Sequence, residues 1–299
     1  MKAFSRNQGL SVYAAVALLG GCGSGSQLGA THVAPGQSWT APEAKKSDLA
    51  YISNFYSSAV LAFTYPGGKN VGSIASDDPQ GECTSKTSDG NWWVVASGND
   101  EISEYAHGGT TPLKTLSEDV GEPAGCTVDP TTGNLAVTIL GAGYVLVFTD
   151  GSGSGTALSD SLSSTYFAAY DDEGDLFVDG ITQSDTYGLV ELHKGGSSFE
   201  PITLHPNIQP ASMQWHGNYL AVGASGSIYH FAIHGSRGKE IGVTPFCCGV
   251  SFWIQGRYVV VPDAGSESAE ICKYPAGSPC KTLSGSFDLP IGATVSVAK

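Results

Sequence analysis

Polar side chains recur where short apolar runs of the chain end. Their carboxylate and amide oxygens could bind a hard cation. Carboxylate and amide oxygens are the ligands that Ca²⁺ takes in proteins. Four of these residues follow strand-like runs and two glutamates lie near the preceding runs: Asn54, Asp100, Asp179 and Asp263, with Glu82 and Glu122. The alternative is that they cap turns or face water. Apart from Ca²⁺ at such a cluster, the sequence predicts no cofactor.

The chain carries none of the short signatures of common hydrolases. A serine-hydrolase elbow needs Gly-x-Ser-x-Gly and a zinc protease needs His-Glu-x-x-His, and both are absent. His230 and His234 are four residues apart, but in a strand-like run this spacing does not bring two imidazoles together as a helix would. We therefore name no catalytic residue.

The elements that would position the polar residues belong to a degenerate repeat. Its best copy, residues 123–138, has two alternating apolar runs joined by Asp-Pro-Thr-Thr-Gly-Asn, whose residue types favour turns. Equivalent positions of the copies are separated by 44, 42, 45, 37 and 43 residues, and they are 81, 125, 167, 212, 249 and 292. A period of roughly 40 residues with several strands per unit is typical of a β-propeller.

Six such units and complementary chain ends predict the closure of the ring. The first unit begins at a second strand, residues 48–53, whereas the last supplies only a first strand, residues 290–297. Pairing the two within one blade leaves no large open sheet edge. The sequence therefore predicts an all-β, six-bladed propeller closed by the C-terminal strand. The six polar residues would then lie at the mouth of its central channel.

The pattern Pro-x-Gly-φ-x-φ-Asp…Gly-Asn-φ-φ-Val, with φ apolar, resembles the NHL-repeat type of propeller. Residues 105–109, 128–137 and 273–277 also resemble a group of uncharacterised bacterial propeller lipoproteins. That resemblance implies a fold and no known activity. Gly81-Glu82 is only superficially similar to the metal-binding glutamate of six-bladed lactonases, whose Asn-Gly…Ser-Pro-Asp run is missing.

Six cysteines remain beyond Cys22, an even number that predicts disulfides in an oxidising compartment. Cys83 and Cys126 fall on innermost strands of neighbouring blades at a similar level, so we expect them to pair. Cys272 and Cys280 flank a hairpin connection and are expected to cross-link its strands. The adjacent Cys247 and Cys248 form either a vicinal disulfide or two free thiols.

The N-terminus is typical of an exported lipoprotein. Lys2 and Arg6 precede an apolar run that is too short to span a membrane, so residues 1–21 are interpreted as a signal peptide. The run ends in Leu-Gly-Gly-Cys22, which resembles a lipobox, so Cys22 is the expected lipidation site. The residues after Cys22 favour the outer membrane in a diderm bacterium. Residues 22–47 are rich in Gly, Ser, Pro and Ala and predict a flexible tether, with the propeller at 48–299.

The net negative charge of the chain limits the kinds of molecule that it can bind. Without Lys2 and Arg6, 14 basic residues become 12 against 28 acidic ones, a net charge of −16. Nucleic acids and anionic lipid surfaces favour basic patches, so we expect contact with neither, and membrane association through the lipid alone. We expect a monomer.

Two functions fit these observations. The first is a lipid-anchored, non-enzymatic envelope module that binds a protein, peptide or glycan. The alternative is a metal-dependent, lactonase-like hydrolase or lyase that uses the carboxylates at the channel mouth. Three or more channel side chains around one metal would favour the second, whereas an apolar or plugged channel would favour the first.

Overall fold

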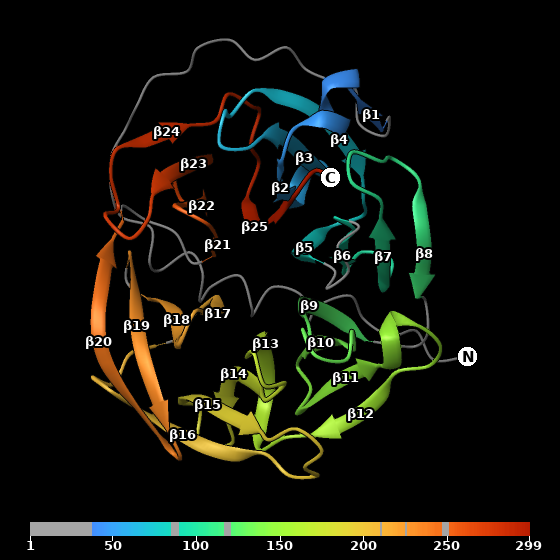
Figure 1. The fold of residues 1–299 in the computed structure, drawn as a ribbon. Helices are drawn as coiled ribbons and strands as arrows, with labels where there is room; N and C mark the ends of the chain where they lie inside the picture. Colours follow the sequence, from blue (N-terminus) through green and yellow to red (C-terminus); the bar gives the residue numbers. More distant parts are fainter. Residues whose placement is uncertain (1–37, 85–89, 117–120, 210, 225, 247–250) are drawn as a thin grey trace.

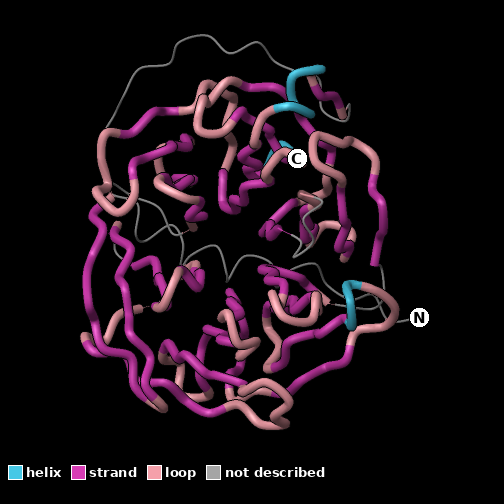
Figure 2. Tube along the Cα trace, in the orientation of Figure 1, coloured by secondary structure: helices cyan, strands magenta, loops and turns pink. Residues whose placement is uncertain are grey.

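The protein is built from small antiparallel sheets arranged around a common centre (Figure 1). The computed structural model describes residues 38–84, 90–116, 121–209, 211–224, 226–246 and 251–299. Within these ranges the only helical segments are three short 3₁₀ turns: η1 (Pro42–Lys46), η2 (Phe55–Ser57) and η3 (Thr149–Gly151). The chain is therefore all-β, as Figure 2 shows by its strand colouring.

Each four-stranded unit has one strand beside the centre, and three further antiparallel strands continue outward from it. The strands nearest the centre are β5 (Pro79–Thr84), β9 (Glu122–Val128), β13 (Leu162–Tyr170), β17 (Met213–His216), β21 (Trp253–Gln255) and β25 (Pro290–Ser296). The second strands are β2 (Leu49–Asn54), β6 (Trp92–Ala96), β10 (Leu135–Leu140), β14 (Leu176–Thr182), β18 (Tyr219–Ala224) and β22 (Tyr258–Asp263).

The outer half of each sheet is more exposed. Third strands are β3 (Ala59–Thr64), β7 (Glu101–Tyr105), β11 (Tyr144–Phe148), β15 (Tyr187–Leu192), β19 (Ser227–His234) and β23 (Ser268–Lys273). Outermost strands are β4 (Asn70–Ala75), β8 (Pro112–Leu116), β12 (Thr156–Ser159), β16 (Glu200–His205), β20 (Arg237–Pro245) and β24 (Cys280–Thr282), with β1 (Trp39–Thr40) added beyond β4. A short parallel pairing of β16 with β20 joins two four-stranded units into one eight-stranded sheet.

The second strands are apolar because they are covered on both faces. All residues of β2 and β6 are buried. Trp92, Trp93 and Phe177 are at most 2% exposed and belong to the core. The Trp92 ring stacks on Tyr51 with centroids 3.9 Å apart and so joins β6 to β2 of the neighbouring sheet. Burial of these side chains between sheets supplies most of the hydrophobic stabilisation.

The two ends of the chain meet in one sheet. β25 pairs antiparallel with β2, from Leu49 opposite Ser296 to Asn54 opposite Pro290. The loop after β7 covers this junction. In it, Nδ1 of the His107 ring and the Ser296 hydroxyl share a 2.6 Å hydrogen bond, and Nε2–H of the same ring donates to the Ser47 carbonyl. In the same loop, Gly108 N donates to the Tyr51 hydroxyl. The motif Tyr-Ala-His-Gly-Gly thus holds the N- and C-terminal segments together.

The structured chain begins earlier than the predicted tether boundary at residue 47. Trp39–Thr40 pairs with β4, and Ala44 in η1 is fully buried. Backbone pairing at the sheet edge orders this segment although its composition is that of a linker. Residues 1–37, with the predicted signal peptide, Cys22 and most of the predicted tether, lie outside the described residues. In the described ranges, no helix is long and apolar enough to cross a membrane.

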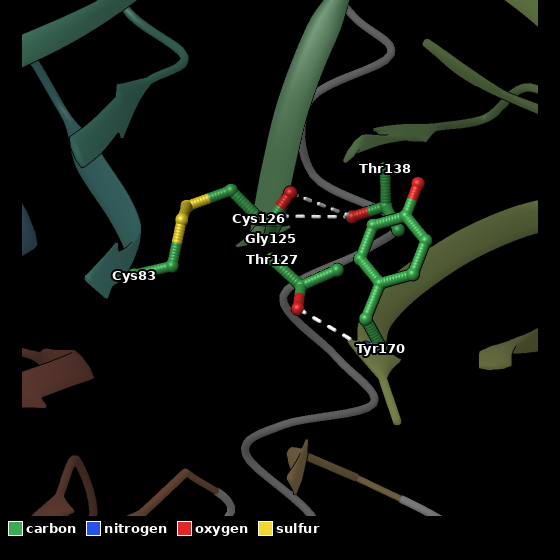
Figure 3. Close-up of a disulfide and its surroundings, with 6 residues drawn as sticks. All are labelled: Cys83, Gly125, Cys126, Thr127, Thr138 and Tyr170. Carbon is green, nitrogen blue, oxygen red and sulfur yellow. Dashed lines mark hydrogen bonds between the residues drawn. A yellow bond between two sulfur atoms is a disulfide. The ribbon is translucent and has the colours of Figure 1, made fainter. Parts of the chain in front are cut away.

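Two disulfides join the expected cysteine pairs. Cys83–Cys126 links the inner strands β5 and β9, with Cα atoms 5.7 Å apart (Figure 3). Cys272–Cys280 links β23 to β24. Two disulfides indicate an oxidising, extracytoplasmic compartment. Cys247 and Cys248 lie outside the described residues.

Neighbouring inner strands approach so closely that several positions accept only glycine. A Cβ atom on Gly292 would lie 2.4 Å from the Gln80 carbonyl oxygen, and one on Gly81 would lie 2.6 Å from the Ala124 carbonyl oxygen. A Cβ atom on Gly125 would lie 2.9 Å from the Tyr166 carbonyl oxygen. These glycines occupy equivalent positions of the repeat, so their backbones form the contacts between β25, β5, β9 and β13.

We expect Gly292→Ala to destabilise the fold by about 2–3 kcal/mol, because the added methyl group overlaps backbone of the neighbouring strand. Urea unfolding measures this loss. The matched control is Gly223→Ala, whose Cβ would meet nothing closer than 3.4 Å. Equal stability of the Gly292 variant and wild type would contradict the packing argument.

Candidate functional site

The central channel is lined by residues of all the inner strands, β5, β9, β13, β17, β21 and β25. It encloses a cavity of about 210 Å³. Aromatic rings and backbone make up much of its wall, with Trp253, Trp215, Phe167 and Tyr170 among the lining side chains. This small volume limits the channel to a small ligand or a single inserted side chain.

The Trp253 indole narrows this channel. Trp253 projects from β21 and packs against the hydrophobic cluster that contains Cys83 and Cys126, as well as the cluster formed by β22, β25 and their neighbours. The side chain therefore reaches across the channel toward the Cys83–Cys126 disulfide. Its Nε1 atom is buried and has no hydrogen-bond partner in the part of the chain that the structure describes, and the same holds for Trp215 Nε1.

Most polar side chains of the channel wall connect neighbouring inner strands. Gln214 on β17 accepts a 2.7 Å hydrogen bond from Ile254 N and donates a 3.0 Å bond to the Ile254 carbonyl on β21. Thr127 on β9 accepts from Tyr170 N on β13 (Figure 3). Their hydrogen-bonding capacity is used by the scaffold, which leaves little for a substrate.

Thr138, on the second strand β10, makes the same kind of bridge. Its hydroxyl accepts a 2.9 Å bond from Gly125 N and donates a 2.8 Å bond to the Tyr166 carbonyl of the next sheet (Figure 3 shows the contact with Gly125). These bonds form where the pairing of β9 with β10 shifts its register between Val137 and Ile139. The hydroxyl thus satisfies backbone groups that the irregularity leaves without a ladder partner.

Glu82 is the only one of the six predicted channel residues that lines the cavity. It is 5% exposed and accepts a 2.5 Å hydrogen bond from the Ser53 hydroxyl. Among the described residues, its other oxygen, Oε2, has no partner. Burial raises the pKa of Glu82 to about 8, so the carboxyl is mostly protonated at neutral pH. A neutral carboxyl is a poor cation ligand.

Asp179 and Asn54 are buried and hold backbone. Asp179 Oδ1 accepts a 2.8 Å bond from Phe167 N, where the pairing of β13 with β14 shifts register, and burial raises the pKa of Asp179 well above its usual value. Asn54 donates to the Ser286 carbonyl and accepts from Asp288 N. Both side chains fix irregular backbone rather than face the channel.

The other three predicted residues lie in turns or at a strand end. Asp263 accepts hydrogen bonds from Gly265 N and from the Ser266 hydroxyl within its own turn. Asp100 is exposed with a left-handed backbone, and Glu122 is exposed at the start of β9. Burial and then the charge of Asp100 raise the pKa of Glu122. Of the described residues, none of the six belongs to a group of three potential metal ligands within 4.8 Å.

Two clusters of chemically active side chains were not predicted from the sequence. Tyr274 shares hydrogen bonds with the Tyr219 hydroxyl, at 2.5 Å, and with His230 Nε2, at 2.9 Å, between β18, β19 and the end of β23. Asp175, Glu191 and His193 gather around the outer part of the sheet β13–β16. A Glu-x-His spacing after an apolar strand was the available signal for the second cluster.

We expect the stability of the protein to fall as pH rises because of Glu82. Its pKa is raised from 4.5 to about 8 by folding, so the folded state binds the extra proton and the stabilisation is lost as pH rises through 8. Glu82→Gln should flatten the decrease between pH 5 and 8 by at most about 1.4 kcal/mol per pH unit. Urea unfolding at several pH values measures it, with Glu173→Gln on an exposed turn as control. An unchanged slope in the Glu82 variant would contradict the assignment.

The sequence matches no protein-family model and no curated protein. The structure is similar to a chain in the crystal structure of a nidogen/laminin complex, with a TM-score of 0.67 and 12% identity, over 85% of this chain and 100% of that chain. It is also similar to the hydrazine synthase of Kuenenia stuttgartiensis, with a TM-score of 0.56 and 15% identity, over 77% of this chain and 74% of that chain.

Both similar structures are known β-propeller folds. At identities of 12% and 15% the likeness concerns the fold alone, and folds of this kind carry many functions. The chain has a β-propeller fold.

Proposed function

We propose that this protein is a lipid-anchored, six-bladed propeller of the bacterial envelope that binds a protein, peptide or glycan and performs no catalysis. Six inner strands, each continued outward in its sheet by a second, a third and an outer strand, support six blades. The pairing of β25 with β2 supports closure by the C-terminal strand. The NHL-like repeat supports the propeller type, and the lipobox-like sequence that ends in Cys22 supports the lipid anchor and the envelope location.

The observation that carries the proposal is the commitment of the channel's polar side chains to the scaffold. Gln214, Thr127 and Thr138 each join two inner strands, and the Glu82 carboxyl is buried against Ser53. General acid–base or metal chemistry needs side chains that converge on a substrate with free lone pairs or protons. A wall in which Gln214 and Thr127 are bonded to the neighbouring strands instead suits a scaffold that presents an outer surface to a ligand.

One of the two solved neighbours is consistent with a role in protein binding. It was crystallised as part of a nidogen/laminin complex, which is an assembly of proteins. The disulfides, which suit an exported protein, agree with an envelope location.

A comparison of binding with turnover tests the proposal. The full chain carrying Cys22→Ser is assayed on peptide and glycan arrays and, separately, against a panel of lactones with added Ca²⁺ or Zn²⁺. We expect saturable binding of one ligand class and no turnover above buffer. Metal-dependent hydrolysis that Glu82→Gln abolishes would establish the lactonase-like alternative, and failure to bind any array member would also contradict the proposal.

Anchoring has its own test. We expect wild-type protein in the membrane fraction and the Cys22→Ser variant in the soluble exported fraction, because only Cys22 can carry the lipid. Mass spectrometry of the N-terminal peptide should find the acyl groups on Cys22. An unmodified N-terminus on wild-type protein would contradict lipidation without affecting the binding proposal.

A further inference from the structure

Three potential metal ligands come from two neighbouring segments of one blade, the β13–β14 turn and β15 with the residue next to its end (Figure 1). Asp175 ends the turn, Glu191 lies in β15 and His193 follows that strand. Leu176 pairs with Leu192, so the residues next to this pair, Asp175 and His193, are adjacent. The hairpin register therefore brings them together.

The backbone around these ligands is fixed by hydrogen bonds of its own. Asp171 Oδ1 accepts from the backbone N–H groups of Glu173, Gly174 and Asp175 and closes the turn. Asp175 Oδ1 accepts a 2.7 Å bond from Lys194 N, which leaves Oδ2 directed at His193. The ligands are thus held in place before any ion arrives, which lowers the cost of binding one.

The separations of the ligand atoms suit a small divalent ion. His193 Nδ1 lies 2.9 Å from Asp175 Oδ2 and 3.7 Å from Glu191 Oε1. A tetrahedral ion with bonds of about 2.0–2.2 Å separates its ligand atoms by about 3.4 Å, between these two values. All three ligand atoms lie within 4.8 Å of one another.

Glu191 supplies an independent indication of a cation. It is 6% exposed, and its Oε1 atom lies 3.7 Å from Nδ1 of the His193 ring. Its nearest basic group is the His193 ring, and it lies directly opposite another acid, Glu200 on β16. A largely buried carboxylate that faces another acid is costly unless a positive charge compensates it.

We propose that Asp175, Glu191 and His193 bind a divalent first-row transition-metal ion of the zinc type. The imidazole nitrogen favours such an ion over Ca²⁺ or Mg²⁺, which take oxygen ligands. Two ionised carboxylates balance its double positive charge, and the imidazole would bind it through a nitrogen that has lost its proton. The His193 side chain is 55% exposed, so solvent or a group from a partner can reach the fourth ligand position.

The other group of three potential ligands does not compete for this ion. It consists of Glu270, Cys272 and Cys280, whose sulfur atoms are joined in a disulfide and cannot act as thiolate ligands. Oxidising conditions therefore leave the Asp175–Glu191–His193 site as the described group with three available ligands.

Metal titration of isosteric variants tests the site. The full chain carrying Cys22→Ser is purified from the exported fraction without reductant, its free thiols are alkylated, and bound metal is removed with a chelator. Calorimetry with Zn²⁺ should give one equivalent, and Co²⁺ should give the absorption bands of a tetrahedral site. Glu191→Gln keeps the size of the side chain and removes its charge, and should weaken Zn²⁺ binding at least about tenfold.

The matched control is Glu200→Gln, which removes the same charge from the facing strand without removing a ligand. We expect it to retain the stoichiometry and the affinity within about twofold, and to retain the Co²⁺ spectrum. Circular dichroism checks that both variants are folded. Absence of stoichiometric binding to wild type, or equal weakening by the two substitutions, would overturn the proposal.

Discussion

Contact between the backbones of neighbouring inner strands is the constraint on which the rest of the structure depends. Where Gly292, Gly81 and Gly125 lie, the next strand is so near that no Cβ atom fits. Because the inner strands lie so close together, the channel that they surround is narrow. The second and third strands lie farther from the centre, and large side chains fill the space between neighbouring sheets. At the equivalent position Ser212 has room for a hydroxyl, which contacts Phe252 N of the neighbouring strand.

The narrow centre has a chemical consequence. Polar side chains there are close enough to bond to the neighbouring strand, and they do so, as Gln214 and Thr127 show. Glu82 at the centre and Asp179 on the second strand β14 are buried, and burial raises the pKa of both. Groups able to bind a cation are found instead where hairpins end in solvent, as at Asp175 and His193. Side chains of the inner strands therefore mainly hold the structure together, and side chains that are free to bind a ligand lie farther from the centre.

Similarity to solved propellers at 12% and 15% identity agrees with this division. The sheets need little more than apolar second strands, turn residues and small residues at the inner contacts, and many sequences meet these requirements. A ligand or partner is selected by loops and outer strands, which the shared fold leaves free to vary. The similarity of fold therefore concerns the scaffold and does not identify a ligand.

The sequence by itself determined the repeat, the strand order, the turn residues and both described disulfides, because each depends on neighbours in the chain or on a fixed period. Asp171 illustrates this, since its carboxylate closes its own turn. The tertiary structure decided the rest. The packing of separate sheets against one another decides that the Glu82 carboxyl lies against Ser53. It likewise decides that the His107 ring bonds to Ser296. Periodicity places a residue on a strand face, but only the packing of sheets distant in sequence determines which groups that face meets.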